Sequence, residues 1–232
     1  AAYKHVPLTE INPFSAIKNN FIDTHIFIQN SIRNKVPYFC LISSDKAVRP
    51  TNIMGASKRL AELSLIYNSK HRSNKCTILN SVRFGNVVNS SGSVMPMFQN
   101  QIQNNNFLTL TSKKINRYFM TIEEASNLVL NSFKLAKGGE VFLLDMGKPI
   151  KLHDLAKLMI QFSGKTIKHN NQGDIQIKII GLRKGEKLYE ELLVDKKSKK
   201  TEISSIYKSL EEIMSQKDFE SLLLNIKKLI EK

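Results

Sequence analysis

The chain has 232 residues, a formal net charge of +15 and 41% hydrophobic residues. This length is enough to bury a core, and the ordinary mix of apolar and charged residues excludes a largely disordered chain. No apolar run approaches the roughly 20 residues of a membrane-spanning helix, the first residues do not form a signal peptide, and the two cysteines are too few for a disulfide framework.

Segments typical of strands and helices alternate along the sequence. Asn12 followed by Pro13 is typical of a helix start, and apolar residues at helical spacing predict a helix from there to about Lys35. This alternation indicates an α/β fold with a mainly parallel sheet. Beyond Lys35 we predict strands over 37–43, 76–84, 107–111, 141–145 and 175–180, and helices over 53–69, 94–104, 122–136, 152–162, 209–224 and 225–232.

The basic charge has no pattern typical of a nucleic-acid binder. Only seven of the 35 basic residues are arginines, and the lysines are spread over the whole chain. Nucleic-acid surfaces more often cluster arginine with aromatic residues. We therefore interpret the charge as a compositional bias, expect no nucleic-acid partner, and note that the same field would attract a small anionic substrate.

A polar block follows the predicted strand over 37–43. It places Ser44, Asp45 and Lys46 side by side at the carboxyl end of that strand, where ligands bind in open α/β sheets. A carboxylic acid beside an amine can act as a general acid and a general base. The structural alternative is a surface turn with a local ion pair. On the next predicted helix, Met54 and Lys58 are four residues apart and therefore share one face.

Many short motifs in this order resemble the extended short-chain dehydrogenase/reductases. Within them, the sequence is most similar to the UDP-N-acetylglucosamine 4,6-dehydratases of polysaccharide biosynthesis. Met54 stands where most of the superfamily has a tyrosine base, and methionine there is typical of the long, membrane-anchored branch of these dehydratases. A dead enzyme or a core methionine is the alternative. The motifs lie at residues 1–7, 44–48, 57–59, 83–87, 90–94, 117–122 and 181–191.

The resemblance implies a reaction and a role for each residue of the polar block. A nicotinamide cofactor, NAD or NADP, takes hydride from C4 of the sugar and returns it to C6 after water has been eliminated. Lys46 matches the base that removes the C5 proton, and Asp45 the acid that protonates the departing C6 hydroxyl. Ser44 would bond the C4 oxygen and Lys58 would hold the nicotinamide ribose. Asn20 matches an asparagine that supports the active-site lysine.

The resemblance also implies binding residues outside that block. An arginine fork suits diphosphate oxygens, and a carboxylate such as that of Glu186 suits ribose hydroxyls. Lys184 departs from the proline usual in the family. The histidines and cysteines show no metal-ligand spacing, so we expect no metal. The implied cofactor contacts are Ala1, Lys4, Lys58, Phe84 and Gly85, and the implied substrate contacts are Asn86, Ser93, Val94, Arg117, Met120, Arg183 and Glu186.

The resemblance further implies how the chain is organised. Residues 1–111 would form the second half of an NAD(P)-binding Rossmann-type domain that carries the catalytic residues, and residues 112–232 mainly a smaller UDP-sugar-binding part with closing helices. No Gly-rich phosphate loop is found in the sequence. We therefore expect an enzyme truncated at its N-terminus, with an exposed apolar strand edge, poorly soluble and inactive by itself.

Family resemblance alone suggests the cellular location, membrane anchoring and oligomeric state of the longer protein. We expect a cytoplasmic location and no membrane contact in this segment, in a homo-oligomeric parent anchored to the inner membrane by helices upstream of residue 1. Two other functions stay open. A sugar-nucleotide 4-epimerase needs only the C4 step, and a non-catalytic module would bind a nucleotide sugar or a polyanion without reducing a cofactor.

Overall fold

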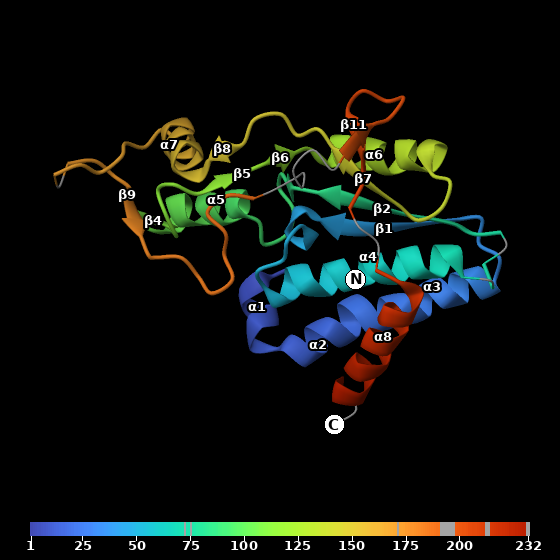
Figure 1. Ribbon diagram of the computed structural model, residues 1–232. Helices are drawn as coiled ribbons and strands as arrows, with labels where there is room; N and C mark the ends of the chain where they lie inside the picture. Colours follow the sequence, from blue (N-terminus) through green and yellow to red (C-terminus); the bar gives the residue numbers. More distant parts are fainter. Residues whose placement is uncertain (72, 75, 171, 191–197, 212–213, 231–232) are drawn as a thin grey trace. The chain divides into compact units, whose positions relative to one another are not determined.

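The computed structural model describes residues 1–232 except 72, 75, 171, 191–197, 212–213 and 231–232 (Figure 1). The chain divides into two compact units, each assembled from separate segments. Each unit has its own core and is described by itself. The functional division predicted at residue 111 stays a prediction. Unit 1 comprises Ala1–Phe84, Ser126–Asp145 and Glu191–Lys232, and unit 2 comprises Gly85–Ala125 and Met146–Glu190.

Unit 1 is built on a five-stranded sheet in the order β1-β2-β7-β11-β10. The first three strands are parallel, and β11 and β10 add to β7 in antiparallel orientation. β1 ends this order, and its Tyr38 and Ile42 are exposed. The strands are β1 (Tyr38–Ser44), β2 (Ile78–Phe84), β7 (Glu140–Leu144), β10 (Ser198–Lys200) and β11 (Ile206–Ser209).

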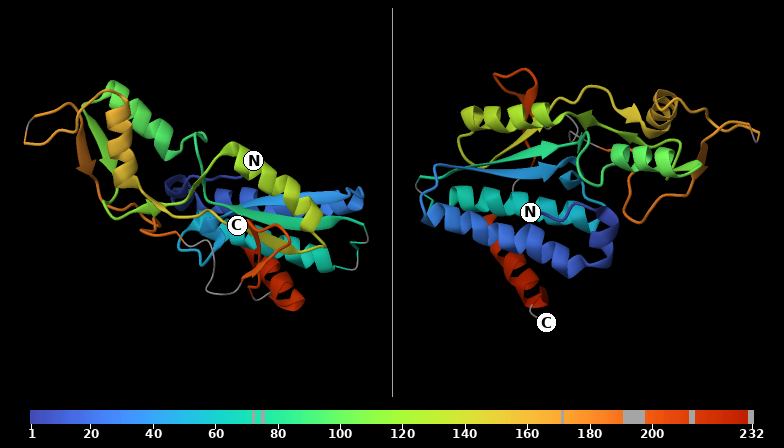
Figure 2. Two further views of the ribbon diagram at one scale, coloured as in Figure 1. Left: turned by 90° about the horizontal axis from the view of Figure 1, so that it is seen from above. Right: turned by 180° about the vertical axis from the view of Figure 1, so that it is seen from behind.

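Helices cover both faces of this sheet (Figures 1 and 2). On one face, Leu79 of β2 packs with Ile28 of α3 (Asp23–Arg33) and Leu65 of α4 (Ile53–Lys70). On the other face, Val82 of β2 packs with Leu128 of α6 (Ile122–Leu135). β1 begins with an apolar run typical of strands in a parallel sheet, whereas β2 also carries the buried polar residues Asn80, Ser81 and Arg83. The predicted Rossmann-type α/β fold is confirmed.

The helix predicted from Asn12 to about Lys35 is confirmed over 13–33 and is wrong only in being a regular α-helix throughout, because a π-helical turn interrupts it. The structure has α1 (Val6–Ile11), α2 (Pro13–Ile17), a π-helical turn over Lys18–Ile22 and then α3. Single π-helical turns insert an extra residue into a helix and often lie at functional sites. Here the turn contains Asn20, a predicted site residue that is 1% exposed.

The two helices predicted after residue 208 are also wrong. Ile206–Ser209 forms β11, and a single helix, α8, spans Gln216–Ile230. Residues 212–213 and 231–232 of the predicted helices lie outside the described residues. Phe219 of α8 packs edge-on against Phe21 at 6.2 Å between ring centroids and stacks on Tyr67 of α4 at 4.7 Å. These aromatic contacts fix the C-terminal helix to the helical layer of unit 1.

Unit 2 has a separate core around one parallel strand pair. β4 (Phe107–Leu110) pairs with β9 (Gln176–Ile179), and both are covered by α5 (Val94–Asn104) and α7 (Leu152–Phe162). Phe98, Leu108, Ile160 and other apolar residues fill this core. Among the described helices of both units, none combines the length and the apolar character that crossing a bilayer requires. Four short strands complete the unit as two pairs: β3 (Asn86–Val87) with β6 (Phe119–Met120), and β5 (Asn116–Arg117) with β8 (Ile150–Lys151).

Candidate functional site

The predicted acid and base meet directly after β1. Ser44 ends that strand, and Asp45–Ala47 forms a 3-10 turn. Asp45 Oδ1 accepts hydrogen bonds from Ser44 Oγ at 2.8 Å and from Lys46 Nζ at 3.0 Å. The side chain of Asp45 is fully buried and its Oδ2 has no hydrogen-bond partner, whereas the Lys46 side chain is 19% exposed. A buried carboxyl oxygen without a partner is costly and suits a group that binds or protonates a ligand.

Tight backbone packing holds this turn against the start of α4. Asn52 caps the helix by accepting a hydrogen bond from the backbone N–H of Gly55 at 2.8 Å. Glu10 of α1 accepts a second one from the N–H of Ile53 at 2.7 Å. Gly55 lies so close to the turn that a Cβ there would fall on the carbonyl oxygen of Lys46. Glycine at position 55 therefore sets how near α4 comes to the predicted acid and base.

Replacing Gly55 with alanine is expected to push the 3-10 turn away from α4. Backbone atoms cannot move aside as a flexible side chain can, so the added methyl group should cost about 1–3 kcal/mol of stability. It should also displace Lys46. Chemical denaturation would measure the loss. Gly85→Ala is the matched comparison, because its new Cβ would meet mainly the flexible end of Met146. Equal stability of Gly55→Ala and the unmodified protein would contradict this account.

The first turns of α4 carry the predicted Met54 and Lys58. Met54 is 3% exposed, and Lys58 is half-buried with its Nζ donating to the carbonyl oxygen of Ile42 at 3.0 Å. Lys58 therefore lies beside β1, near the polar turn that follows this strand. Burial lowers the pKa of Lys58 below its usual value, and the negative charge of Glu62 opposes part of that shift.

Asn20 contacts the residue before the lysine that it was predicted to support. Its Nδ2 donates to Ser57 Oγ at 2.9 Å and to the carbonyl oxygen of Tyr3 at 2.9 Å, and its Oδ1 accepts from the N–H of Tyr3 at 2.7 Å. The π-helical turn thus joins the N-terminal segment to α4. The carbonyl oxygen of Ala1, a predicted cofactor contact, accepts from Asn19 Nδ2.

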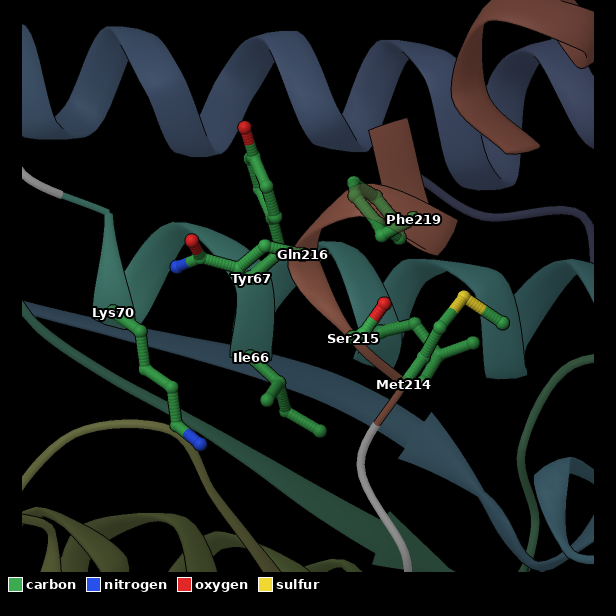
Figure 3. Close-up of a pocket in the computed structure, with 8 residues that line it drawn as sticks. Ile66, Tyr67, Lys70, Met214, Ser215, Gln216 and Phe219 are labelled. Atoms are coloured by element: carbon green, nitrogen blue, oxygen red, sulfur yellow. The ribbon is translucent and has the colours of Figure 1, made fainter. Parts of the chain in front are cut away.

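Two cavities of unit 1 lie in this helical layer. One, of about 320 Å³, is lined by Tyr3, the predicted cofactor contact Lys4, and residues of α1 and α2. The other, of about 280 Å³, lies between α4 and the segment that enters α8. Figure 3 shows Tyr67 and Lys70 on one side of it and Met214 and Phe219 on the other. Its walls are mainly apolar, and none of its residues was predicted as a site.

Several predicted cofactor and substrate residues of unit 2 lie in or near the short strands β3 and β6. Gly85 precedes β3, and a Cβ there would crowd the thioether of Met146 and the Cβ of Tyr118. Asn86 Nδ2 donates to the carbonyl oxygen of Tyr118 at 3.1 Å, so this side chain is used within the unit. Met120, in β6, is buried. Ser93 Oγ, just before Val94 and α5, is buried without a hydrogen-bond partner.

The two predicted diphosphate arginines differ in their surroundings. Arg117 is 8% exposed and donates to the carbonyl oxygens of Asn116 at 2.7 Å and Lys187 at 2.9 Å. Its guanidinium also lies 3.5 Å from a carboxylate oxygen of Glu186. Arg183 is exposed, and its backbone N–H donates to Glu186. Arg117 thus shapes the loop that carries Arg183 and Glu186.

The structure brings the predicted residues together in two sets, one in each unit. Unit 1 holds Asn20, Ser44, Asp45, Lys46, Met54 and Lys58, with Phe84 at the end of β2, and unit 2 holds the substrate residues. In the part of the chain that the structure describes, no three histidine, cysteine or acidic side chains are grouped as metal ligands. Sequence analysis missed Glu62 and Arg83, which are both almost fully buried. A charged residue within an apolar strand, as Arg83 is, was the available signal.

Comparison with known sequences gives a family. The sequence pattern of the family described as "Polysaccharide biosynthesis protein" matches residues 1–211. The chain is 52% identical over 193 residues to the capsular polysaccharide biosynthesis protein CapD of Staphylococcus aureus, a match that covers 83% of this chain and 31% of CapD. It is 37% identical over 202 residues to the UDP-glucose 4-epimerase of Rickettsia canadensis, covering 87% of this chain and 57% of that protein. The chain therefore spans only part of these relatives.

Solved structures show the same fold. Pen from Bacillus thuringiensis superposes with a TM-score of 0.81 at 36% sequence identity, over 97% of this chain and 73% of Pen. DesIV, a dTDP-glucose 4,6-dehydratase of Streptomyces venezuelae solved with NAD bound, superposes with a TM-score of 0.71 at 15% identity, over 83% of this chain and 62% of DesIV. At that identity, the second likeness concerns the fold alone.

Proposed function

Because this chain belongs to the family of polysaccharide biosynthesis proteins, we propose that it is the catalytic part of a nucleotide-sugar 4,6-dehydratase. The substrate proposed is UDP-N-acetylglucosamine, and the cofactor NAD or NADP. The observation that carries the proposal is the buried Asp45 beside Lys46 at the end of β1. Oxidation at C4 alone needs no such pair, whereas elimination of water needs an acid for the leaving hydroxyl and a base for the C5 proton.

Ser44, Asp45 and Lys46 at the end of β1, here called the strand-end set, each have a proposed role in the reaction. Asp45 Oδ2, which has no partner, is the oxygen that would donate a proton to the C6 hydroxyl as it leaves. Lys46, whose amine is partly exposed, would accept the C5 proton. Ser44 Oγ, already bonded to Asp45, would hold the C4 oxygen. Met54 has no ionisable group, so the proton chemistry falls to the neighbouring Asp45 and Lys46.

The cofactor would lie beside Lys58. This ammonium has three N–H donors, one of which goes to the carbonyl oxygen of Ile42, and ribose hydroxyls suit the others. A bound nicotinamide cofactor would supply hydride removal at C4 and hydride return at C6. Arg183 and Glu186 are proposed to bind the diphosphate and ribose of the substrate. We propose that the 232-residue chain alone is inactive.

Mass spectrometry of the product tests the proposal. The enzyme that contains this chain is incubated with UDP-N-acetylglucosamine and NAD or NADP. A dehydratase is expected to give a nucleotide sugar that has lost one water. A product of unchanged mass but altered sugar configuration would contradict the proposal and support a 4-epimerase, the function that the Rickettsia canadensis relative is named for. Unchanged substrate with a fully loaded cofactor would also contradict it.

A further inference from the structure

A network of buried charges lies directly behind the strand-end set. Glu62 of α4 accepts hydrogen bonds from Ser43 Oγ at 2.6 Å, Arg83 Nε at 2.8 Å and Arg83 Nη2 at 2.7 Å. Arg59 Nη1 adds a fourth at 3.0 Å. All the atoms belong to unit 1, and both Glu62 and Arg83 are almost fully buried. Glu62 thereby joins the end of β1 and the end of β2 to α4.

The C-terminal segment completes this network. Glu211, just after β11, accepts from Arg83 Nη1 at 2.5 Å and Nη2 at 3.1 Å. Its Oε2 also lies 2.8 Å from Arg59 Nη1. Two arginines thus face two glutamates, and the charges cancel. A buried arginine that loses one of its carboxylates keeps an uncompensated charge away from water, which is strongly unfavourable.

The pKa shifts agree with this balance of charge. Burial alone would lower the pKa of Arg83, but the charge of Glu62 and the hydrogen bonds that Arg83 donates to both carboxylates raise it above its usual value. Burial alone would raise the pKa of Glu211, but the hydrogen bond and the charge of Arg83, with the charge of Arg59, lower it. Arg83 and Glu211 therefore stay ionised around neutral pH.

Members of the network on β1, β2 and α4 adjoin residues of the proposed active site. Ser43 immediately precedes Ser44, and it stands opposite Arg83 in the β1–β2 ladder. Glu62 is one helical turn after Lys58. Glu62 acts on Lys58 through its negative charge, and the hydrogen bond from Ser43 to Glu62 ties the network to the backbone of β1.

We propose that Glu62 and Glu211 are positioning residues, and that the segment after β11 supports the catalytic strand end by keeping this network charge-balanced. The role in catalysis rests on the proposed function, whereas the mechanical role does not. Without Glu211, the remaining carboxylate has to serve two arginines, and the hydrogen bond from Ser43 to Glu62 is weakened by that competition. The strand end that carries Ser44, Asp45 and Lys46 then loosens.

Hydrogen–deuterium exchange on the 232-residue protein tests the mechanical role. In Glu211→Gln, the amides of residues 43–46 are expected to exchange at least about tenfold faster than in the unmodified protein, because a charge-assisted hydrogen bond is lost. Amides of β7 should be unchanged, which separates local loosening from global unfolding. Glu220→Gln is the matched control, because Glu220 of α8 bonds Tyr67 at the surface, away from the network.

A double variant tests the balance of charge. Arg59→Gln combined with Glu211→Gln removes one cation and one anion, and it leaves Arg83 paired with Glu62. Exchange at residues 43–46 should return most of the way to that of the unmodified protein. Unchanged exchange in Glu211→Gln, equal acceleration across β7, or no recovery in the double variant would each overturn the proposal.

Kinetics of the enzyme that contains this chain test the catalytic part. Glu211→Gln is expected to lower kcat about tenfold or more with KM for the UDP-sugar unchanged, because small displacements of catalytic groups slow the chemical step. A change in KM alone would overturn it. If the unmodified enzyme forms no dehydrated product while exchange behaves as expected, the proposed function fails and the mechanical role of the network stands.

Discussion

The Asp45→Asn enzyme is expected to form dehydrated nucleotide sugar about 10²–10⁴-fold more slowly than the unmodified enzyme, the usual contribution of a general acid. Asparagine has nearly the same shape and can still accept the hydrogen bonds of Ser44 and Lys46, but it has no proton to give to the C6 hydroxyl. Oxidation at C4 also releases the proton of the C4 hydroxyl, which Asp45 would accept because Met54 cannot, so neither reduced cofactor nor a 4-keto sugar should accumulate. Absorbance of the reduced nicotinamide and product mass would follow the two steps.

Lys46→Gln should slow the same step by a similar factor, because the C5 proton then has no base. The surface pair Lys18–Asp23 provides the matched control: it has the same two charges at 3.1 Å, but both side chains are about half exposed. Asp23→Asn and Lys18→Gln should leave turnover unchanged. Full turnover of the Asp45→Asn enzyme would show that Asp45 is not the acid of the elimination.

A large loss of stability is expected from Phe219→Ala. The ring is 1% exposed and packs on Phe21, Tyr67 and His25, so removing it leaves a cavity beneath α8. Phenylalanine-to-alanine changes in a core typically cost about 3–5 kcal/mol. Urea unfolding followed by circular dichroism would measure the shift in midpoint. The cavity of about 280 Å³ already present beside Phe219 leaves room for its neighbours to rearrange, which favours the lower end of that range.

Leu224→Ala is the control for this prediction. Leu224 belongs to the same helix but is 54% exposed, so the substitution removes little buried surface and keeps the helix intact. A loss of stability as large as that of Phe219→Ala would mean that the buried aromatic contacts are not what holds α8 in place.

Periodicity was enough to predict most of unit 1 and its active edge. β1, β2 and β7 are segments of strand length rich in strand-forming residues, and α4 follows a polar block at the expected residue. The position of Ser44, Asp45 and Lys46 after a buried strand follows from that pattern alone. The pairing of Asp45 Oδ1 with both neighbours does not, because it depends on the 3-10 turn and on the close approach of Gly55.

Tertiary contacts decided the elements that the sequence did not predict. The π-helical turn depends on Asn20 bonding both Tyr3 and Ser57, residues remote in sequence. β10 and β11 are short and carry lysine and serine, so no apolar run marked them, and their pairing to β7 makes them strands. Glu62 looks like an ordinary charged helix residue until folding brings it against Arg83.

During synthesis of the chain, Arg83 is made well before its ion-pair partner Glu211. The two residues are 128 positions apart, and ribosomes add about 5–20 residues per second, so Glu211 is made roughly 6–26 s after Arg83. During that interval β1, β2 and α4 have been made, while Arg83 and Arg59 share the single carboxylate of Glu62. The nascent sheet therefore carries one uncompensated positive charge in its interior. A stop codon between these two residues would leave that charge permanently unbalanced, so truncated products should fail to reach a stable fold and become substrates for proteolysis.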